Sequence, residues 1–358
     1  MINVDVTPRK ETPRWLQLLT PVATIFAALV VGAVPLVFSG FNPINAYEIV
    51  LLQPLSTPAG LTQTLVKAVP LTLASLAVYL PMRAGLWNIG AEGQIYVGGI
   101  VATWVALNIN APTGIMLVLV VLGGAFGGGI WGFIPGWLRA KWDVNEIIVT
   151  LMMTFIAVSI NDYMVHGPMQ GGRAGYPASE MIGEAAQLPS IPGTGVHLGI
   201  VLAVLAVVFV YVLLKQTRFG YEATVQESNP RAAFHAGISD YRVFVTVMVL
   251  GGALAGIGGM AEIAGSQHRL LANFSPGYGF TAIAIALLGR NSAFHVLLAS
   301  LFFSVLFVGA GFISVQLNVS AALVEIIQAL IILFLLTATF FQQFEVSLER
   351  SAVGGEAV

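Results

Sequence analysis

Charge is what this sequence has least of. Lys, Arg, Asp and Glu make up 9% of the 358 residues, whereas hydrophobic residues make up 57%. A soluble domain carries roughly 25% charged residues, so this composition excludes an ordinary globular domain in water. The chain also has no cysteine, which excludes disulfides, thiolate metal sites and a cysteine nucleophile.

Several catalytic patterns are missing as well. The chain has no GxxxxGK[ST] phosphate-binding loop, no HExxH, no GxSxG and no dinucleotide-binding fingerprint. Its five histidines are scattered and form no cluster of metal ligands. A membrane-embedded enzyme therefore has no catalytic constellation in its favour, and we expect neither a cofactor nor a metal in this chain.

Long apolar runs are what the sequence has instead. A bilayer core takes about 20 apolar residues in an α-helix, and about ten segments reach or approach that length: 17–39, 61–82, 90–109, 113–138, 145–161, 196–214, 243–261, 279–289, 293–315 and 321–341. The segment 279–289 is too short to cross without its flanks. We predict an all-α polytopic membrane protein of about ten transmembrane helices.

The polar segments set the organisation of the chain. We expect an N-terminal tail (1–16), a transmembrane domain (17–343) and a C-terminal tail (344–358). The two longest connections differ in composition, because 162–195 is rich in Gly and Pro whereas 215–242 carries four basic residues. Basic loops lie on the cytoplasmic side. The loop 215–242 is therefore predicted to be cytoplasmic and the loop 162–195 extracytoplasmic.

The distribution of all basic residues agrees with ten spans and two cytoplasmic termini. This arrangement places twelve of the fifteen inside: Arg9, Lys10, Arg14, Arg83, Arg139, Lys141, Lys215, Arg218, Arg231, Arg242, Arg290 and Arg350. A count of nine spans would move some of them to the opposite face. The other three (Lys67, Arg173 and Arg269) fall within a span or outside.

The stretch "ESNPRAAFHAGIS" in the cytoplasmic loop has the marks of a short helix. Asn229 can cap its first amides, and Pro230 fits the first helical position. Gly237 can supply the left-handed residue after its end. A helix this short is not stable alone, so it is either an incidental loop helix or one that docks into a cytoplasmic partner. Arg231 and Phe234 would be its contact residues.

The stretch "GLWNIGAEGQ" (85–94) places polar side chains between three glycines. Such spacing makes an uninterrupted helix unfavourable, so we predict a broken or re-entrant segment. Its polar side chains would face a cavity lined by protein or water. These side chains are Asn88, Glu92 and Gln94.

Ionisable residues at membrane depth are costly and are functional or interhelical by default. The sequence has four acidic candidates and a single basic one, Lys67: the acidic residues are Glu92, Glu146, Glu262 and Glu325. We expect no intramembrane charge pair, which favours a path for a neutral polar solute over one for an ion. The alternative is a self-sufficient secondary carrier in which these glutamates bind the coupling ion.

Glycines at small-xxx-small spacing occur in 123–132 and 251–259, as in Gly123/Gly127 and Gly251/Ala255/Gly259. This spacing lets helix backbones approach each other closely in lipid. We interpret it as packing within the chain.

"GLWNIGAEGQIYVGG" resembles the signature of permease subunits of ABC importers for nucleosides, within the superfamily of ribose and branched-chain amino-acid permeases. Three further stretches agree in order: "DVNEIIVTLMMTFIA" (143–157), "VQESNPRAAFHAGI" (225–238) and "SPGYGFTAIAIALLGRNSAF" (275–294). The resemblance covers about 60–340. One departure is Thr154, where family members often have Asn.

The resemblance implies an ATP-driven importer subunit that does no chemistry itself. ATP and Mg²⁺ would bind to two cytoplasmic ATPase subunits, and the other partners would be a second permease and an extracytoplasmic solute-binding protein, with no nucleic acid. The implied location is the cytoplasmic membrane of a bacterium or archaeon.

The resemblance also assigns residues. Those coupled to the ATPase would be Asn229, Pro230, Arg231, Phe234 and Gly237. Those along the substrate path would be Trp87, Asn88, Glu92, Gln94, Asn145, Glu146 and Phe280. Nucleosides are the first expected solutes, because ribose hydroxyls and base edges bind amides and carboxylates. Simple sugars and riboflavin-like compounds stay open.

Overall fold

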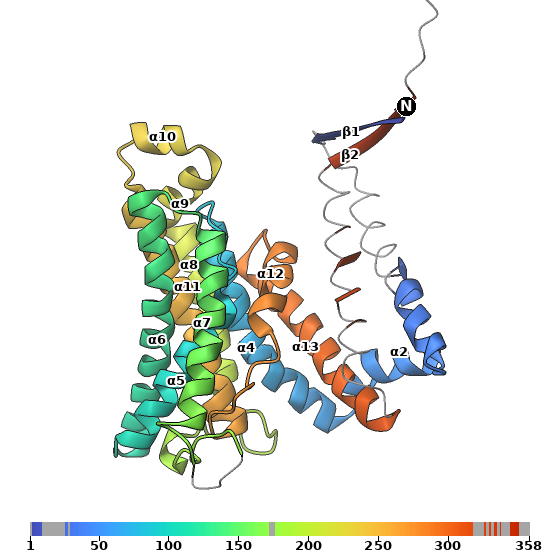
Figure 1. The fold of residues 1–358 in the computed structure, drawn as a ribbon, viewed down its shortest axis with the longest axis vertical. Helices are drawn as coiled ribbons and strands as arrows, with labels where there is room; N and C mark the ends of the chain where they lie inside the picture. The colour runs from blue at the N-terminus through green and yellow to red at the C-terminus, as the bar shows by residue number, and fades with distance from the viewer. Residues whose placement is uncertain are drawn as a thin grey trace, which may run out of the picture. The chain divides into compact units, whose positions relative to one another are not determined.

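The computed structural model describes residues 2–8, 26–27, 29–171, 176–317 and 344–350, with six further residues between 326 and 337 (Figure 1). It divides into two units. One comprises Leu51–Gly309, and the other comprises Met1–Val50 with Ala310–Val358.

The larger unit is helical and carries all the predicted site residues. Its elements are α3 (Gln53–Ser56), α4 (Pro58–Met82), α5 (Ala91–Asn108), α6 (Thr113–Trp142), α7 (Glu146–His166), η1 (Glu184–Ala186), α8 (Gly199–Gln216), α9 (Arg218–Ser228), α10 (Pro230–His235), α11 (Asp240–Glu262), the π-helical turn η2 (Ile263–Gln267), α12 (Tyr278–Leu288) and most of α13 (Ala293–Gln316). The all-α prediction holds for this unit.

The smaller unit adds a feature that the sequence analysis did not predict. It contains all of α2 (Pro43–Leu51) except its last residue. Its strands β1 (Ile2–Pro8) and β2 (Phe344–Arg350) pair antiparallel, with Ile2 opposite Arg350. Both strands alternate apolar and polar residues, which is the pattern of a strand rather than of an unstructured tail. A shared strand pair requires both chain ends on the same side of the membrane, as the predicted topology does.

Six of the described helices are long and apolar enough to cross a membrane: α4, α6, α7, α8, α11 with η2, and α13. Helix α12 and the helical residues 29–38 are shorter apolar segments. The predicted number of about ten is therefore not confirmed. Most of the predicted span 321–341, with Glu325, and the first part of 17–39 lie outside the described residues.

The core is built around α11, which packs against α4, α5 and α6. Glycines at the crossing of α6 and α11 face each other, so that a Cβ on Gly128 would lie 2.7 Å from the Cα of Gly256. Gly251 faces α4 in the same way, since its Cβ would lie 2.7 Å from the Ala77 carbonyl oxygen. The interpretation of these glycines as packing within the chain is confirmed.

The larger unit has two distinct ends. Helix α10 lies at one end, and the connection after α7 lies at the other (Figure 1). That connection begins after His166 rather than at 162, because α7 is longer than predicted, and its described residues are ordered by turns, one 3₁₀ turn and isolated bridges such as Ala178–Leu271, as the Gly- and Pro-rich composition predicts. Near α10, Arg83 forms an ion pair with Glu227 at 3.3 Å. The two loops that the basic residues assign to opposite faces therefore lie at opposite ends.

Candidate functional site

The polar residues of 85–94 are occupied within the protein. Asn88 is fully buried and donates to the Ala77 carbonyl at 3.0 Å and to Gln94 Oε1 at 2.9 Å, while Gln94 donates back to Asn88 Oδ1 at 3.2 Å. This reciprocal amide pair closes the non-helical turn between α4 and α5. Because α5 begins at Ala91, the break predicted in this stretch lies before Glu92 rather than around it.

Glu92 connects two helix N-termini. It lies in the first turn of α5 and is 3% exposed, and its Oε2 accepts the Gly279 N–H of α12 at 2.6 Å. A carboxylate at a helix N-terminus satisfies an orphan amide and complements the helix dipole. Gly279 is required here because a Cβ would collide with the Glu92 backbone. Glu92 therefore joins α12 to α5.

Glu146 and Asn145 organise the start of α7. Asn145 is the N-cap and accepts the Ile147 N–H at 2.9 Å. The buried Glu146 accepts the Trp87 N–H at 3.3 Å and forms an ion pair with Arg139 at 3.4 Å. Asn145 therefore fixes the start of α7, and Glu146 holds the loop that carries Trp87.

The predicted path residues thus fall into two groups. Those with exposed side chains are Trp87 (38% exposed), Phe280 (44%) and Asn145, and those buried in hydrogen-bonded positions are Asn88, Glu92, Gln94 and Glu146. The side chains of the second group stabilise the frame around α5, α7 and α12. Contact of either group with a solute stays a prediction.

A second break lies between η2 and α12, where 268–277 are not helical. Its backbone carbonyls accept side-chain hydrogen bonds: Asn161 donates to Leu271 and Ala272 at 3.0 and 2.8 Å, and Gln267 donates to Phe274 at 2.8 Å. Irregular backbone at membrane depth needs such partners. Helix α12, which lies within the predicted segment 279–289 apart from its first residue, is a short apolar helix that follows this irregular segment.

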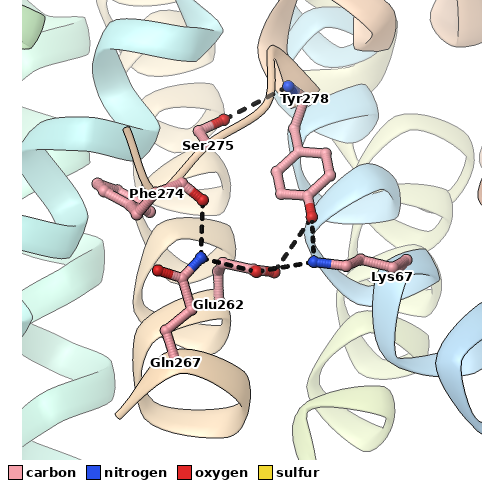
Figure 2. A network of polar contacts seen from close by, with 6 residues as sticks. All are labelled: Lys67, Glu262, Gln267, Phe274, Ser275 and Tyr278. Atoms are coloured by element: carbon pink, nitrogen blue, oxygen red, sulfur yellow. Dashed lines mark hydrogen bonds and ion pairs between the residues drawn. The ribbon is translucent and has the colours of Figure 1, made fainter. Parts of the chain in front are cut away.

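A charge cluster lies beside this break, and the sequence analysis missed it (Figure 2). Lys67 Nζ on α4 lies 2.9 Å from Glu262 Oε1 at the end of α11 and 2.7 Å from the Tyr278 hydroxyl of α12. Gln267 Nε2 also donates to Glu262 Oε1, at 3.0 Å. We call these four residues the ion-pair cluster. The expectation that no charge pair lies within the spans is wrong, because the two partners are 195 positions apart in sequence and meet only in the fold.

One member of the ion-pair cluster, Gln267, lines a cavity at the end of the unit opposite α10. This cavity has a volume of about 750 Å³ and lies between the loop after α7 and the residues that follow η2. Tyr176, Glu180, Gln267 and Arg269 are among its lining residues. Gln267 therefore belongs to both the cavity and the cluster. The volume is in the range of small-molecule sites.

Helix α10 has the capping that the sequence predicts. Asn229 Oδ1 accepts the Ala232 N–H at 3.0 Å, and Pro230 is the first helical residue. Gly237 has a φ of +74° and donates to the Phe234 carbonyl, while Ile238 donates to the Ala233 carbonyl, both at 3.0 Å. This is the Schellman arrangement. The helix is therefore fixed in length at both ends.

The outer face of α10 is unoccupied by other described residues. Phe234 is 73% exposed and Arg231 is also exposed, whereas Ala233 on the opposite face is buried. An exposed aromatic ring next to a cation is the composition of a protein-contact surface rather than of a solvated loop.

Among the described residues no group of three His, Cys, Asp or Glu could hold a metal ion.

Comparison with known proteins finds one matching family and several similar chains. The family described as "Branched-chain amino acid transport system / permease component" matches residues 60–336. A glucose ABC transporter permease protein of Haloferax volcanii is 50% identical over 99% of this chain and 97% of its own length. A guanosine ABC transporter permease protein of Bacillus subtilis is 34% identical (88% and 92%), and a nucleoside ABC transporter permease protein of Lactococcus lactis is 32% identical (89% and 90%).

Proposed function

Since the chain belongs to the family of permease components of branched-chain amino acid transport systems, we propose that it forms the translocation path of an ATP-driven importer for a neutral solute that carries a sugar ring. It is a multi-pass membrane protein, with six described helices long enough to span. The observation that carries the proposal is α10, a capped helix with Phe234 73% exposed.

Helix α10 would transmit ATP hydrolysis to this chain. Its fixed length, the ring of Phe234 and the charge of Arg231 form a compact projection that can insert into a groove of an ATPase subunit. The permease domain itself has no phosphate-binding loop. ATP and Mg²⁺ would therefore bind to that partner, and this chain would be a transport subunit rather than an enzyme.

The solute is inferred from the chemistry that the relatives' names share. Glucose and nucleosides both carry a neutral ring with several hydroxyls, and the relatives named for them are 50% and 32–34% identical to this chain. The identities favour a free hexose over the nucleoside that sequence analysis put first. A second permease and an extracytoplasmic solute-binding protein would complete the importer, in the cytoplasmic membrane of a bacterium or archaeon.

Uptake by the reconstituted complex tests this function. The complex would be purified through a tag on this chain and placed in liposomes that enclose ATP, and entry of radiolabelled glucose and of guanosine would be measured with the solute-binding protein outside. We expect uptake of one solute that stops when ADP replaces ATP. Uptake that persists without ATP and follows an ion gradient would instead support the secondary carrier.

A further inference from the structure

We propose that Lys67 is a solute-binding residue whose ammonium group donates a hydrogen bond to a ring hydroxyl of the transported solute. The inference rests on the proposed function and deepens it, because it assigns a contact in the path to a residue that sequence analysis left without a role. The evidence is the hydrogen bonding of the ion-pair cluster and the exposure of Lys67.

One N–H donor of the Lys67 ammonium group has no hydrogen-bond partner among the described residues. An ammonium group has three N–H donors, and those of Lys67 reach Glu262 Oε1 at 2.9 Å and the Tyr278 hydroxyl at 2.7 Å. No third acceptor is found among the described residues. The Tyr278 hydroxyl in turn lies 3.4 Å from Glu262 Oε2, so both oxygens of the carboxylate are occupied. Figure 2 shows this row of contacts, with Lys67 at one end.

The exposure of the Lys67 side chain indicates which side of the ammonium group is open to a ligand. Glu262 and Tyr278 are 1% and 0% exposed, but the side chain of Lys67 is 32% exposed. A charged group at membrane depth faces water or the interior of a bundle rather than lipid. The open side of Lys67 therefore faces a polar space within the assembled transporter.

A second unsatisfied group of the cluster lies away from Lys67. Gln267 lines the cavity of about 750 Å³, and its Oε1 is buried with no hydrogen-bond partner among the described residues. In Figure 2 this oxygen lies at the opposite end of the row from Lys67. The buried oxygen of Gln267 is closed to a solute, so the group that the cluster offers is the spare donor of Lys67, which a sugar hydroxyl can accept.

The charge of the cluster fits a neutral solute. Lys67 and Glu262 cancel each other, so the site offers a strong donor without a net charge that would attract ions. A purely structural role explains this pair less well, since apolar residues of similar volume hold helices together as well as a buried ion pair does. A contact between the ammonium group and the solute explains why a lysine occupies position 67.

The test compares a solute with analogues that lack single hydroxyls. The tagged complex in ATP-loaded liposomes would be given glucose and its 2-, 3- and 6-deoxy analogues, or guanosine and its 2′- and 3′-deoxy analogues, whichever parent it transports. We expect the wild type to prefer the parent over one analogue by about tenfold or more in kcat/KM, as a charged hydrogen bond predicts. In Lys67→Met/Glu262→Gln that ratio should fall to near one.

The double variant keeps the cluster neutral and leaves Gln267 and Tyr278 an amide partner. If the double variant does not assemble, the apolar pair Lys67→Met/Glu262→Met takes its place. Lys215→Met is the control, because this substitution removes an exposed lysine at the other end of the unit. A variant that assembles and keeps the wild-type ratio would overturn the inference, as would a wild type indifferent to every missing hydroxyl. A wild type that moves neither parent solute would overturn the proposed function and the inference with it.

Discussion

Replacing Gly128 by Ala tests the close contact of α6 and α11 on which the whole core depends. A Cβ at this position would lie 2.7 Å from the Cα of Gly256 and still closer to the carbonyl oxygen of Gly252. Both neighbours are backbone atoms of a packed helix, so no flexible side chain can move aside. The two helices would have to separate along their contact.

The expected cost follows from the rigidity of both surfaces. Extra atoms in a packed core cost typically 1–3 kcal/mol, and we expect Gly128→Ala to lie at the upper end, at about 3 kcal/mol. Gly129→Ala is the matched control, because a Cβ there would meet the Val249 carbonyl oxygen at 3.5 Å and the Ala253 Cβ at 3.7 Å, which are ordinary contacts. Both substitutions change helix propensity equally, so their difference isolates packing.

The assay is unfolding of the purified chain in mild detergent by titration with SDS, followed by circular dichroism. Gly128→Ala should lower the free energy of unfolding by about 3 kcal/mol, and Gly129→Ala by less than about 1 kcal/mol. Equal effects of the two substitutions would refute the assignment of Gly128 to the helix contact.

Three further predictions concern the site and its surroundings. Arg231→Ala with Phe234→Ala should abolish ATP-driven uptake in liposomes but leave membrane insertion intact, and unchanged uptake would remove the docking role of α10. Glu92→Ala should lower the free energy of unfolding by about 1–2 kcal/mol because α12 loses its cap, whereas Glu92→Gln keeps an acceptor and should cost less; equal losses would contradict the cap. Burial lowers the pKa of His197 below its ordinary value of 6.5, so folding favours the neutral ring and this contribution to stability is lost as the pH falls below about 6.5. Between pH 7.5 and 5 the melting temperature should fall less in His197→Gln than in wild type, and an equal fall in the two would contradict the burial of a neutral ring.

Local signals in the sequence predicted much of the structure. The caps and stop of α10 lie within nine residues, so Asn229, Pro230 and Gly237 could be read without the fold. The glycine spacing of 123–132 and 251–259 likewise predicted close helices, because small residues at one-turn intervals have one physical use in lipid. The period-two alternation of β1 and β2 is also a local signal, and it lies in chain ends that were predicted to be tails.

Partners distant in sequence could not be predicted. Glu92 was expected to face a cavity, but it accepts from Gly279, which is 187 positions away. Lys67 was noted as the one basic residue in a span, but its partner Glu262 follows 195 positions later. No intramembrane charge pair was expected from the sequence, because Lys67 is far along the chain from every acidic candidate in a span except Glu92. Only the packing of α4 against α11 identifies the two residues.

The central claim is that this chain works as a subunit of an ATP-driven complex. Its most direct test is purification from the native membrane in mild detergent through a tag on this chain, with the associated proteins identified by mass spectrometry. We expect a P-loop ATPase and a second permease to be recovered with wild type, and the ATPase to be lost with the α10 variant Arg231→Ala/Phe234→Ala. A chain recovered alone or as a homodimer that transports solute in ATP-free liposomes would contradict the account.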